Sequence, residues 1–213
     1  MAKCNNISMS VIRRLPRYYR FLSELDSQNV ERISSNKLAE IMHVTASQVR
    51  QDLNCFGGFG QQGYGYQVKA LKDEITNILG LNLNHPAILI GFGNLGKAVA
   101  SHMSFNRLGF DLKGIFDKDI NVIGSKIGGI TVRSNTDIDR FIEENSIDSA
   151  FLCIPQNSVE DTVERLYKSG IRTFWNFSHF DITNIFEDAI VENVHLSDSL
   201  MTLCYRMNEK IDK

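Results

Sequence analysis

The stretch AILIGFGNLG, residues 87–96, decides the fold of the larger part of this chain. Its first six residues form a continuous apolar run, which is typical of a parallel strand buried on both faces. The glycine pattern Gly91-x-Gly93-x-x-Gly96 follows directly and opens a helical pattern. Roughly 20 positions further on, Asp117 ends a second apolar run. Strand, glycines, helix and acidic residue in this order predict a dinucleotide-binding, Rossmann-like turn.

Each part of this fingerprint has a chemical role. We expect Gly91 to permit the tight turn, Gly93 to let a pyrophosphate approach the backbone, and Gly96 to let the helix pack on the strand. The helix N-terminus offers free amides and partial positive charge to phosphates. Asp117 would accept from both ribose hydroxyls and repel a 2′-phosphate, which favours NAD(H) over NADP(H), although the basic Lys118 is its neighbour.

Strands and helices alternate through the rest of this region. Strand patterns cover residues 110–116, 130–133, 150–154, 173–177 and 190–196, and helical patterns cover 137–144 and 158–168. The alternation predicts a doubly wound α/β domain. A last helical pattern, 196–210, carries an apolar stripe with nothing after it to cover it. This helix either packs back on its own sheet or packs against a second subunit.

The N-terminal third has three helical patterns. The first covers residues 8–25 and contains Pro16, which either kinks the helix or stands in its first turn. The second begins near Ser34 or Ser35, both plausible N-caps. The third begins at Thr45, where Thr45-x-x-Gln48 predicts a capping box. Only two residues separate the second and third helices, which predicts a helix-turn-helix.

The third helix exposes short or hydrogen-bonding side chains suited to a major groove, namely Ala46, Ser47, Arg50, Gln51 and Asn54. The alternative is an ordinary helical hairpin with a solvated polar face. The next stretch, FGGFGQQGYGYQV at 56–68, alternates glycines with aromatic residues, and Tyr64, Tyr66 and Val68 have strand spacing. It predicts a wing after a recognition helix, with a flexible connector as the alternative, and a helix follows at 68–79.

Charge separates the two regions. The 213 residues carry a net charge of −2, which alone gives no sign of a nucleic-acid partner. Residues 1–72, however, hold ten Lys and Arg against five Asp and Glu, a net of +5, and the remainder has a net of −7. Residues 80–86 (GLNLNHP) read as the linker. We therefore expect two domains with different partners, although sampling scatter could give the same asymmetry.

Composition excludes other classes. No stretch approaches the roughly 18 apolar residues that cross a bilayer, and the first 14 residues lack the apolar segment of a secretory signal. The four cysteines lie far apart without a C-x-x-C pair, which argues against a disulfide framework or a structural zinc site. We expect a cytoplasmic protein with reduced thiols, no metal and no membrane contact.

An enzyme is the main alternative function. A kinase-type phosphate loop is excluded because Ala98 stands where a hydroxyl residue would hold magnesium. A small NAD-dependent oxidoreductase with an N-terminal interaction domain stays open. It has little support, because only 117 residues follow Gly96, there is no Tyr-x-x-x-Lys pair, and no acid/base group stands out. We expect no catalytic residues.

These motifs together resemble the Rex family of redox-sensing transcriptional repressors. The similarity covers nearly the whole chain, and its most specific stretches are residues 33–35, 38–40, 44–50, 52–53, 57–66, 91–98, 154–155, 175–177 and 191–194. The resemblance implies a homodimer that exchanges C-terminal helices. It also implies binding to operators near genes of anaerobic and respiratory metabolism, with release of the DNA when NADH replaces NAD⁺. The implied domains are a winged helix at 1–80, a Rossmann-like domain at 85–195 and a dimerisation helix at 196–213.

Motifs and resemblance together give three sets of expected site residues. NAD(H) contacts are expected at Gly91, Phe92, Gly93, Asn94, Leu95, Gly96, Asp117, Lys118, Ile154, Pro155, Asn176, Phe177 and Ser178. Contacts to double-stranded operator DNA are expected at Arg14, Ser34, Ser35, Thr45, Ala46, Ser47, Gln48, Arg50, Gln51, Phe59, Gly60, Gln62, Gly63, Tyr64 and Tyr66. Switch and dimer positions are expected at Arg20, His102, His195, Leu196, Leu200, Leu203 and Met207.

The chain departs from the family pattern in two places. Gln51 stands where the family usually has Lys, and Gln61 and Gln62 stand where the wing usually has basic residues. Fewer cations predict weaker DNA binding with a flatter salt dependence. In the family's switch network an Arg matched by Arg20 joins a Tyr and an Asp, whose positions here hold His102 and His195. We expect the redox response to be weakened or pH-sensitive.

Overall fold

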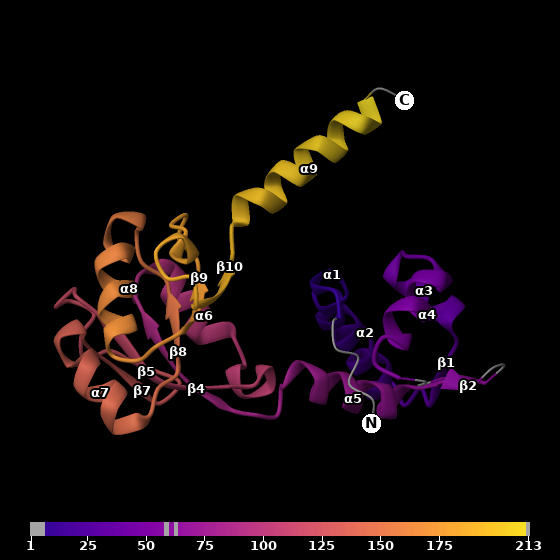
Figure 1. Ribbon diagram of the computed structural model, residues 1–213, viewed down its shortest axis with the longest axis horizontal. Coiled ribbons are helices and arrows are strands. Elements are labelled where there is room, and N and C mark those ends of the chain that lie inside the picture. The colour runs from indigo at the N-terminus through magenta and orange to yellow at the C-terminus, as the bar shows by residue number, and fades with distance from the viewer. Residues whose placement is uncertain (1–6, 58–59, 62–63, 212–213) are drawn as a thin grey trace. The chain divides into compact units, whose positions relative to one another are not determined.

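The computed structural model describes residues 7–57, 60–61 and 64–211. The chain divides into two compact units, Met1–Asn82 and Leu83–Lys213, and each is described by itself. Figure 1 labels their helices and strands. Among the helices in the described ranges, none is long and apolar enough to cross a membrane.

The N-terminal unit is mainly helical. Its helices are α1 (Met9–Ile12), α2 (Leu15–Ser27), α3 (Ser35–Met42), α4 (Ala46–Asn54) and α5 (Val68–Leu79). The first predicted helix is thus two helices, and Pro16 stands in the first turn of the second one. A proline is tolerated there because its missing N–H would have no partner in the first turn anyway. The predicted helix at 68–79 is confirmed.

A small antiparallel sheet completes this unit. Its strands β1 (Arg32–Ile33), β2 (Gly60–Gln61) and β3 (Gly65–Gln67) lie in the order β1-β3-β2. The side chains of α2 to α5 and the sheet enclose one core, which includes Leu15, Tyr18, Leu22, Leu38, Met42, Val49, Leu53, Leu71 and Ile75. A helix-turn-helix followed by a hairpin confirms the predicted winged helix.

The C-terminal unit is built on a seven-stranded sheet. The strands are β4 (His85–Ile90), β5 (Phe110–Asp117), β6 (Lys126–Ile127), β7 (Ile130–Ser134), β8 (Ser149–Leu152), β9 (Thr173–Asn176) and β10 (Ile190–Asn193). Their order is β10-β9-β8-β4-β5-β7-β6, and all neighbours are parallel except β6 and β7. Without the edge strand β6, which the sequence did not predict, this is the doubly wound Rossmann order.

Helices cover both faces of this sheet. On one face, α6 (Asn94–His102) and the 3₁₀ helix η1 (Phe105–Leu108) pack with one apolar cluster. On the other, α7 (Ile138–Asn145) and α8 (Val159–Lys168) pack with a second cluster (Figure 1). Three further 3₁₀ turns are η2 (Asn135–Asp137), η3 (Gln156–Ser158) and η4 (Ile182–Asn184). The strand order changes direction between β4 and β8, which is where such folds bind ligands.

Several predicted boundaries need correction. The linker is shorter than residues 80–86, because β4 begins at His85 and Pro86 pairs with Asp111. Strand β8 ends at Leu152, and strand β10 ends at Asn193, because their pairing with neighbouring strands stops there. The last helix, α9 (Leu196–Ile211), begins only three residues after β10.

Candidate DNA-binding and nucleotide-binding sites

Two side-chain caps fix where the two helices of the helix-turn-helix begin. Ser34 accepts a hydrogen bond from the Lys37 amide at the start of α3, and Thr45 accepts one from the Gln48 amide at the start of α4, each at 3.1 Å. His43 adopts a left-handed backbone conformation (φ 50°), which ends α3 and turns the chain. The predicted N-caps at Ser34 and Thr45 are therefore confirmed.

The outer face of α4 is polar. Ser47, Arg50, Gln51 and Asn54 are exposed, whereas Ala46 is half-buried against the core. Arg50 donates to the Ser35 hydroxyl at 3.1 Å, which ties the recognition helix to the first turn of α3. This face carries one cation and several neutral hydrogen-bonding groups, as a groove-reading helix requires.

Half of the predicted capping box is wrong. The Thr45 hydroxyl caps α4, but the Gln48 side chain does not return to the Thr45 amide. Instead its Nε2 donates to Asp52 Oδ1 at 2.8 Å, one turn further along the helix. The bond to Asp52 is charge-assisted, and it turns the Gln48 side chain away from the Thr45 N–H that its amide oxygen would accept from in a capping box.

Asp52 is the centre of a polar network that the sequence analysis did not assign. The residue is 0% exposed. It accepts from Arg14 Nε at 2.8 Å, from Arg14 Nη2 at 2.6 Å and from the Tyr18 hydroxyl at 3.1 Å. Burial alone would raise the pKa of Asp52, but hydrogen bonds from Arg14, Gln48 and Tyr18 outweigh burial and lower it. A signal was available, since an Asp between Val49 and Leu53 lies on the apolar side of α4.

The wing places its two tyrosines differently. Tyr64 lies in the turn before β3 and is 70% exposed, and its carbonyl accepts from Arg32 at 3.4 Å. Tyr66 is only 7% exposed and belongs to the core, and its expected contact with DNA stays a prediction. The expected strand spacing fails because Val68 already begins α5. Gly60 lies in β2, whereas the expected contacts Phe59, Gln62 and Gly63 lie outside the described residues.

The three glycines after β4 behave differently from one another. Gly91 has φ +96°, and a Cβ built on it would stand 2.5 Å from the Cys153 carbonyl oxygen. A Cβ on Gly96 would stand 1.9 Å from the Gly91 carbonyl oxygen. A Cβ on Gly93 meets nothing within 4 Å. Gly91 and Gly96 are thus required by the fold, whereas Gly93 leaves open space over the backbone that a phosphate could fill.

Helix α6 begins without a side-chain cap. Its N-cap is Gly93, which has no side chain, whereas α3 and α4 are capped by hydroxyls. The first amides of a helix have no partner within it. Those of Asn94, Leu95 and Gly96 therefore meet the open space at Gly93, where the helix dipole favours an anion. Phe92, just before this turn, is buried and packs with the core.

Asp117 ends β5 beside the glycine turn. One carboxylate oxygen accepts from the Phe92 amide at 2.5 Å and the other from the Asp119 amide at 2.8 Å. These bonds fix the carboxylate next to the loop. Each oxygen keeps a second lone pair, so the group can still accept from a ribose hydroxyl. The adjacent Lys118 is exposed.

The remaining expected nucleotide contacts lie in the two segments that follow β8 and β9. Ile154 and Pro155 come directly after β8 and are half-buried or exposed. Asn176 is 0% exposed, and its amide donates to Phe180 O and Asn193 Oδ1 while its oxygen accepts from the Ser178 amide and hydroxyl. The hydrogen-bonding capacity of the Asn176 side chain is used within the protein, and the expected contact of this residue with the nucleotide stays a prediction. Asn176 instead holds the loop 176–180, which includes the half-buried Phe177 and the buried Ser178.

Two known family models match this chain, one in each of the two units. A family model described as "Putative DNA-binding protein N-terminus" matches residues 6–54, and one described as "CoA binding domain" matches residues 82–180. The redox-sensing transcriptional repressor Rex of Thermoanaerobacter pseudethanolicus is 52% identical over 99% of this chain and 93% of its own. The repressor Rex of Clostridium perfringens is 49% identical over 98% of each chain.

The chain belongs to the Rex family of redox-sensing transcriptional repressors. A crystal structure of RSP in complex with β-NAD⁺ and operator DNA matches with a TM-score of 0.88 and 52% identity, covering 97% of this chain and 94% of that chain. The structure of RSP with β-NADH matches with a TM-score of 0.87 and 50% identity, covering 96% and 95%. Rex proteins are repressors, so the alternative of a small oxidoreductase is wrong.

The expected switch residues of this Rex-family chain lie on different units. Arg20 is exposed on α2 of the N-terminal unit, and His102 is exposed at the end of α6. His195 lies between β10 and α9, where its Nε2 is 3.1 Å from the Ser178 carbonyl and its Nδ1 is 3.6 Å from Asp198. Its ring also stacks on His179, with centroids 4.8 Å apart.

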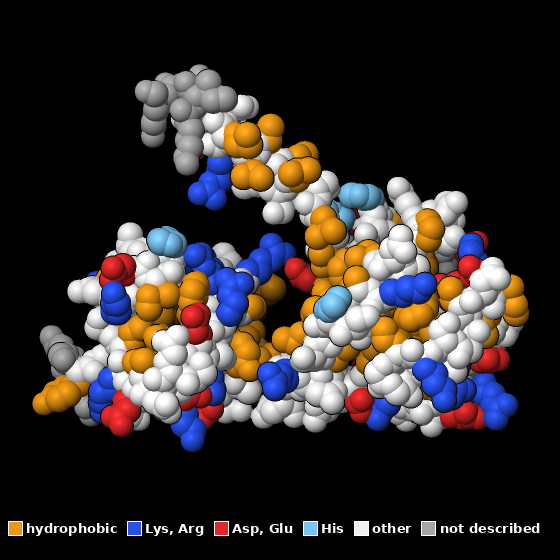
Figure 2. Space-filling view, turned by 180° about the vertical axis from the view of Figure 1, so that it is seen from behind, with side chains coloured by type: hydrophobic (Ala, Val, Ile, Leu, Met, Phe, Trp, Pro, Cys, Tyr) orange, Lys and Arg blue, Asp and Glu red, His pale blue; other side chains and the backbone are white. Residues whose placement is uncertain are grey.

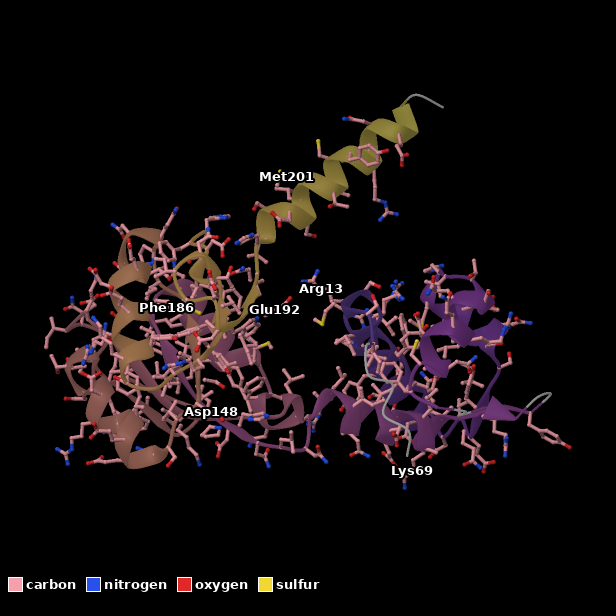
Figure 3. The ribbon with its side chains drawn as sticks, in the orientation of Figure 1. Arg13, Lys69, Asp148, Phe186, Glu192 and Met201 are labelled. Carbon is pink, nitrogen blue, oxygen red and sulfur yellow. The ribbon has the colours of Figure 1, made fainter. Side chains whose placement is uncertain are left out.

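The C-terminal helix of this Rex-family chain exposes its apolar residues. Every residue of α9 from Leu196 to Glu209 is exposed, including Leu196, Leu200, Met201, Leu203, Tyr205 and Met207. Figure 2 shows hydrophobic side chains along this helix, and Met201 stands out from it in Figure 3. Within the described ranges, no three His, Cys, Asp or Glu side chains come together as a metal site would require.

Proposed function

We propose that this protein represses transcription as a homodimer that binds operator DNA and is released from it when NADH replaces NAD⁺. One observation carries the proposal. The chain joins a winged helix with an exposed polar recognition face to a Rossmann turn with an uncapped helix, in the same order as RSP. Structures of RSP hold β-NAD⁺ with operator DNA in one case and β-NADH in another. A repressor acts on the chromosome, so the proposal implies a cytoplasmic protein.

The residues at the carboxyl edge of the sheet fit a dinucleotide. The open space at Gly93 accepts a pyrophosphate, and the amides of Asn94, Leu95 and Gly96 would donate to its oxygens. Asp117 would accept from the adenosine ribose. When bound, the nucleotide supplies a nicotinamide ring that is cationic when oxidised and neutral when reduced. Pro155 and the backbone of the loop 176–178 would line the nicotinamide end.

The DNA-facing residues are those left exposed on α3, α4 and the wing. Ser47, Arg50 and Gln51 would reach base edges in the major groove from α4. The N-termini of α3 and α4, with Ser34, Ser35 and Thr45, would meet phosphates. Tyr64 would contact the backbone from the wing. Gln51 is neutral, so the salt dependence of binding should be modest for a repressor.

Dimerisation is supported by two apolar surfaces that the described part of the chain leaves uncovered. One is the exposed stripe of α9, which includes Leu196, Leu200, Leu203 and Met207. The other is a cavity of about 370 Å³ over β8 to β10, lined mainly by Phe105, Phe110, Phe151, Trp175 and Ile190. Exposed apolar patches of this kind mark interaction sites. We assign the exchanged helix of a second subunit to them, and a two-fold dimer matches a palindromic operator.

The loop 176–180 links the nucleotide edge to the dimer helix. It contacts β10 through the bond from Asn176 to Asn193, and it contacts the residue before α9 through Ser178 and His195. A change in the charge of the nicotinamide ring at this loop would favour a different orientation of α9, and with it a different arrangement of the two subunits. The spacing of the recognition helices would then change. This is a population shift, which requires the two nucleotides to differ in affinity for the two states.

The two histidines at switch positions, His102 and His195, would make this response depend on pH. Imidazole is the side chain that normally changes charge between pH 5 and 8. His195 is placed between a carbonyl and the carboxylate of Asp198, beside His179. A proton here would favour the contact with Asp198. We therefore propose that the NADH response depends on pH.

The proposal is tested by mobility shift on genomic fragments, with NAD⁺ or NADH added at fixed salt. Retention of specific fragments that are released by NADH supports it. If no fragment is retained with either nucleotide, even at low salt, the proposed function is wrong.

A further inference from the structure

The Asp52 network joins three parts of the N-terminal unit. Asp52 belongs to the recognition helix α4, Tyr18 to α2, and Arg14 to the junction of α1 and α2. Arg14 donates through two nitrogens, which is the bidentate geometry that fixes a carboxylate in direction as well as distance. The carboxylate is fully buried and the Arg14 side chain is 33% exposed, so water screens this pair less than it screens a pair that lies wholly on the surface. The network therefore holds α4 against α2.

The same carboxylate fixes the side chain of Gln48. A carboxylate can only accept, so the group that Gln48 turns toward Asp52 must be its NH₂. One N–H is used in this bond. The amide oxygen and the second N–H remain, on a side chain that is half-buried at the N-terminal end of the recognition helix. One acceptor and one N–H are what the major-groove edge of adenine binds through its N6 and N7.

We propose that Arg14 and the buried Asp52 form a positioning clamp for the recognition helix, and that this clamp holds the Gln48 amide to read an adenine of the operator. The proposal deepens the proposed function and rests on it. It also changes the expected role of Arg14. Two of its nitrogens face Asp52, so Arg14 acts through α4 and Gln48 rather than as a phosphate contact.

The two roles of Arg14 predict different salt dependence. Removing a phosphate contact lowers the salt slope of binding by about 1 and weakens all sequences alike. Removing a positioning residue leaves the slope and the non-specific affinity in place and reduces only the preference for the operator. The salt slope therefore distinguishes a phosphate contact from a positioning residue.

The test uses the full-length chain and three variants. R14M/D52L replaces both partners with apolar groups of similar size, so no buried charge is left alone, and the one buried group that loses its acceptor is the Tyr18 hydroxyl. Q48M keeps the buried pair and removes only the amide. The control R140Q/E144Q removes an exposed ion pair on α7 in the other unit. Affinities for operator and for competitor DNA are measured by fluorescence anisotropy at several salt concentrations.

We expect R14M/D52L and Q48M each to lose operator preference by about tenfold, with the salt slope unchanged, since a bidentate base contact contributes about 1–3 kcal/mol of discrimination. In a scan, each adenine of the operator is replaced in turn by 7-deazaadenine, which lacks N7. At one position per half-site this replacement should lower the affinity of the wild type about fivefold and leave the affinity of Q48M unchanged. R140Q/E144Q should match the wild type.

Wild-type operator preference that persists in Q48M overturns the proposal, as does a scan in which no adenine distinguishes Q48M from the wild type. A salt slope that falls by about 1 in R14M/D52L returns Arg14 to the phosphate backbone and overturns the clamp. If R14M/D52L does not fold, Q48M and the scan decide alone. If the wild type shows no preference for any operator, the proposed function fails and the clamp fails with it.

Discussion

Replacing Gly93 by alanine should separate folding from nucleotide binding. Gly93 has φ −72° and ψ −166°, which alanine adopts without strain, and its new Cβ would meet no protein atom within 4 Å. Gly-to-Ala changes at such positions stabilise by about 0.4–1 kcal/mol, because the unfolded chain loses freedom. The free energy of unfolding should therefore stay level or rise slightly.

The same Cβ would occupy the space through which a pyrophosphate reaches the α6 amides. Losing one charge-assisted hydrogen bond costs about 1.5–3 kcal/mol. Because about 1.4 kcal/mol is a factor of ten, NADH affinity should fall about 10- to 150-fold. Urea unfolding measures the first quantity and calorimetric titration with NADH the second.

Gly129→Ala is the matched control. Gly129 also faces open space, but its φ of +84° disfavours any side chain, and it lies between β6 and β7 at the other end of the strands. It should lose about 1 kcal/mol of stability with unchanged NADH affinity. The reasoning is refuted if G93A binds NADH within twofold of the wild type, or if G93A loses more than about 1 kcal/mol of stability.

Three further predictions follow. Gly96→Ala should destabilise the chain by about 1–3 kcal/mol or more even without nucleotide, since its Cβ would stand 1.9 Å from a backbone oxygen; unchanged urea unfolding would contradict this. The pKa of Asp52 is lowered below 3.8 in the folded state, so its contribution to stability is present above that pH and is lost as the pH falls through the lower folded pKa. In urea unfolding at a series of acidic pH values, the stability of R14M/D52L should therefore fall less steeply with falling pH than that of the wild type. An equally steep fall would refute the assignment. Release of operator by NADH should change between pH 6 and 8 and become flat in H102N/H195N, and a wild-type response that is already flat would exclude the histidine scheme.

The fold could be predicted because its signals are local. The apolar run of β4, the spacing of Gly91, Gly93 and Gly96, and the hydroxyl caps at Ser34 and Thr45 each act within a few residues. Hydrophobic periodicity then placed most helices and strands. Strand ends were less accurate, because a strand stops where its neighbour stops pairing, and the neighbour is far away in sequence.

The site residues could be predicted only in part. Tyr66 and Asn176 carry groups that suit a ligand, yet both are buried and serve the protein itself. The Gln48 side chain matched a capping box in sequence, but its amide nitrogen donates to the buried Asp52 one turn away. A spacing motif cannot report how many hydrogen-bonding partners a side chain already has.

The sequence by itself determined a winged helix joined to a doubly wound sheet, the glycine turn and the Rex-family resemblance. Only the tertiary structure decided which polar groups stay free for a partner. Two of the three partners of Asp52, Arg14 and Tyr18, lie 38 and 34 residues before it, so no local pattern contains them. Burial decides which polar groups stay free. A carboxylate taken out of water must make its hydrogen bonds within the fold, whereas an exposed side chain can keep its hydrogen-bonding groups for DNA or nucleotide.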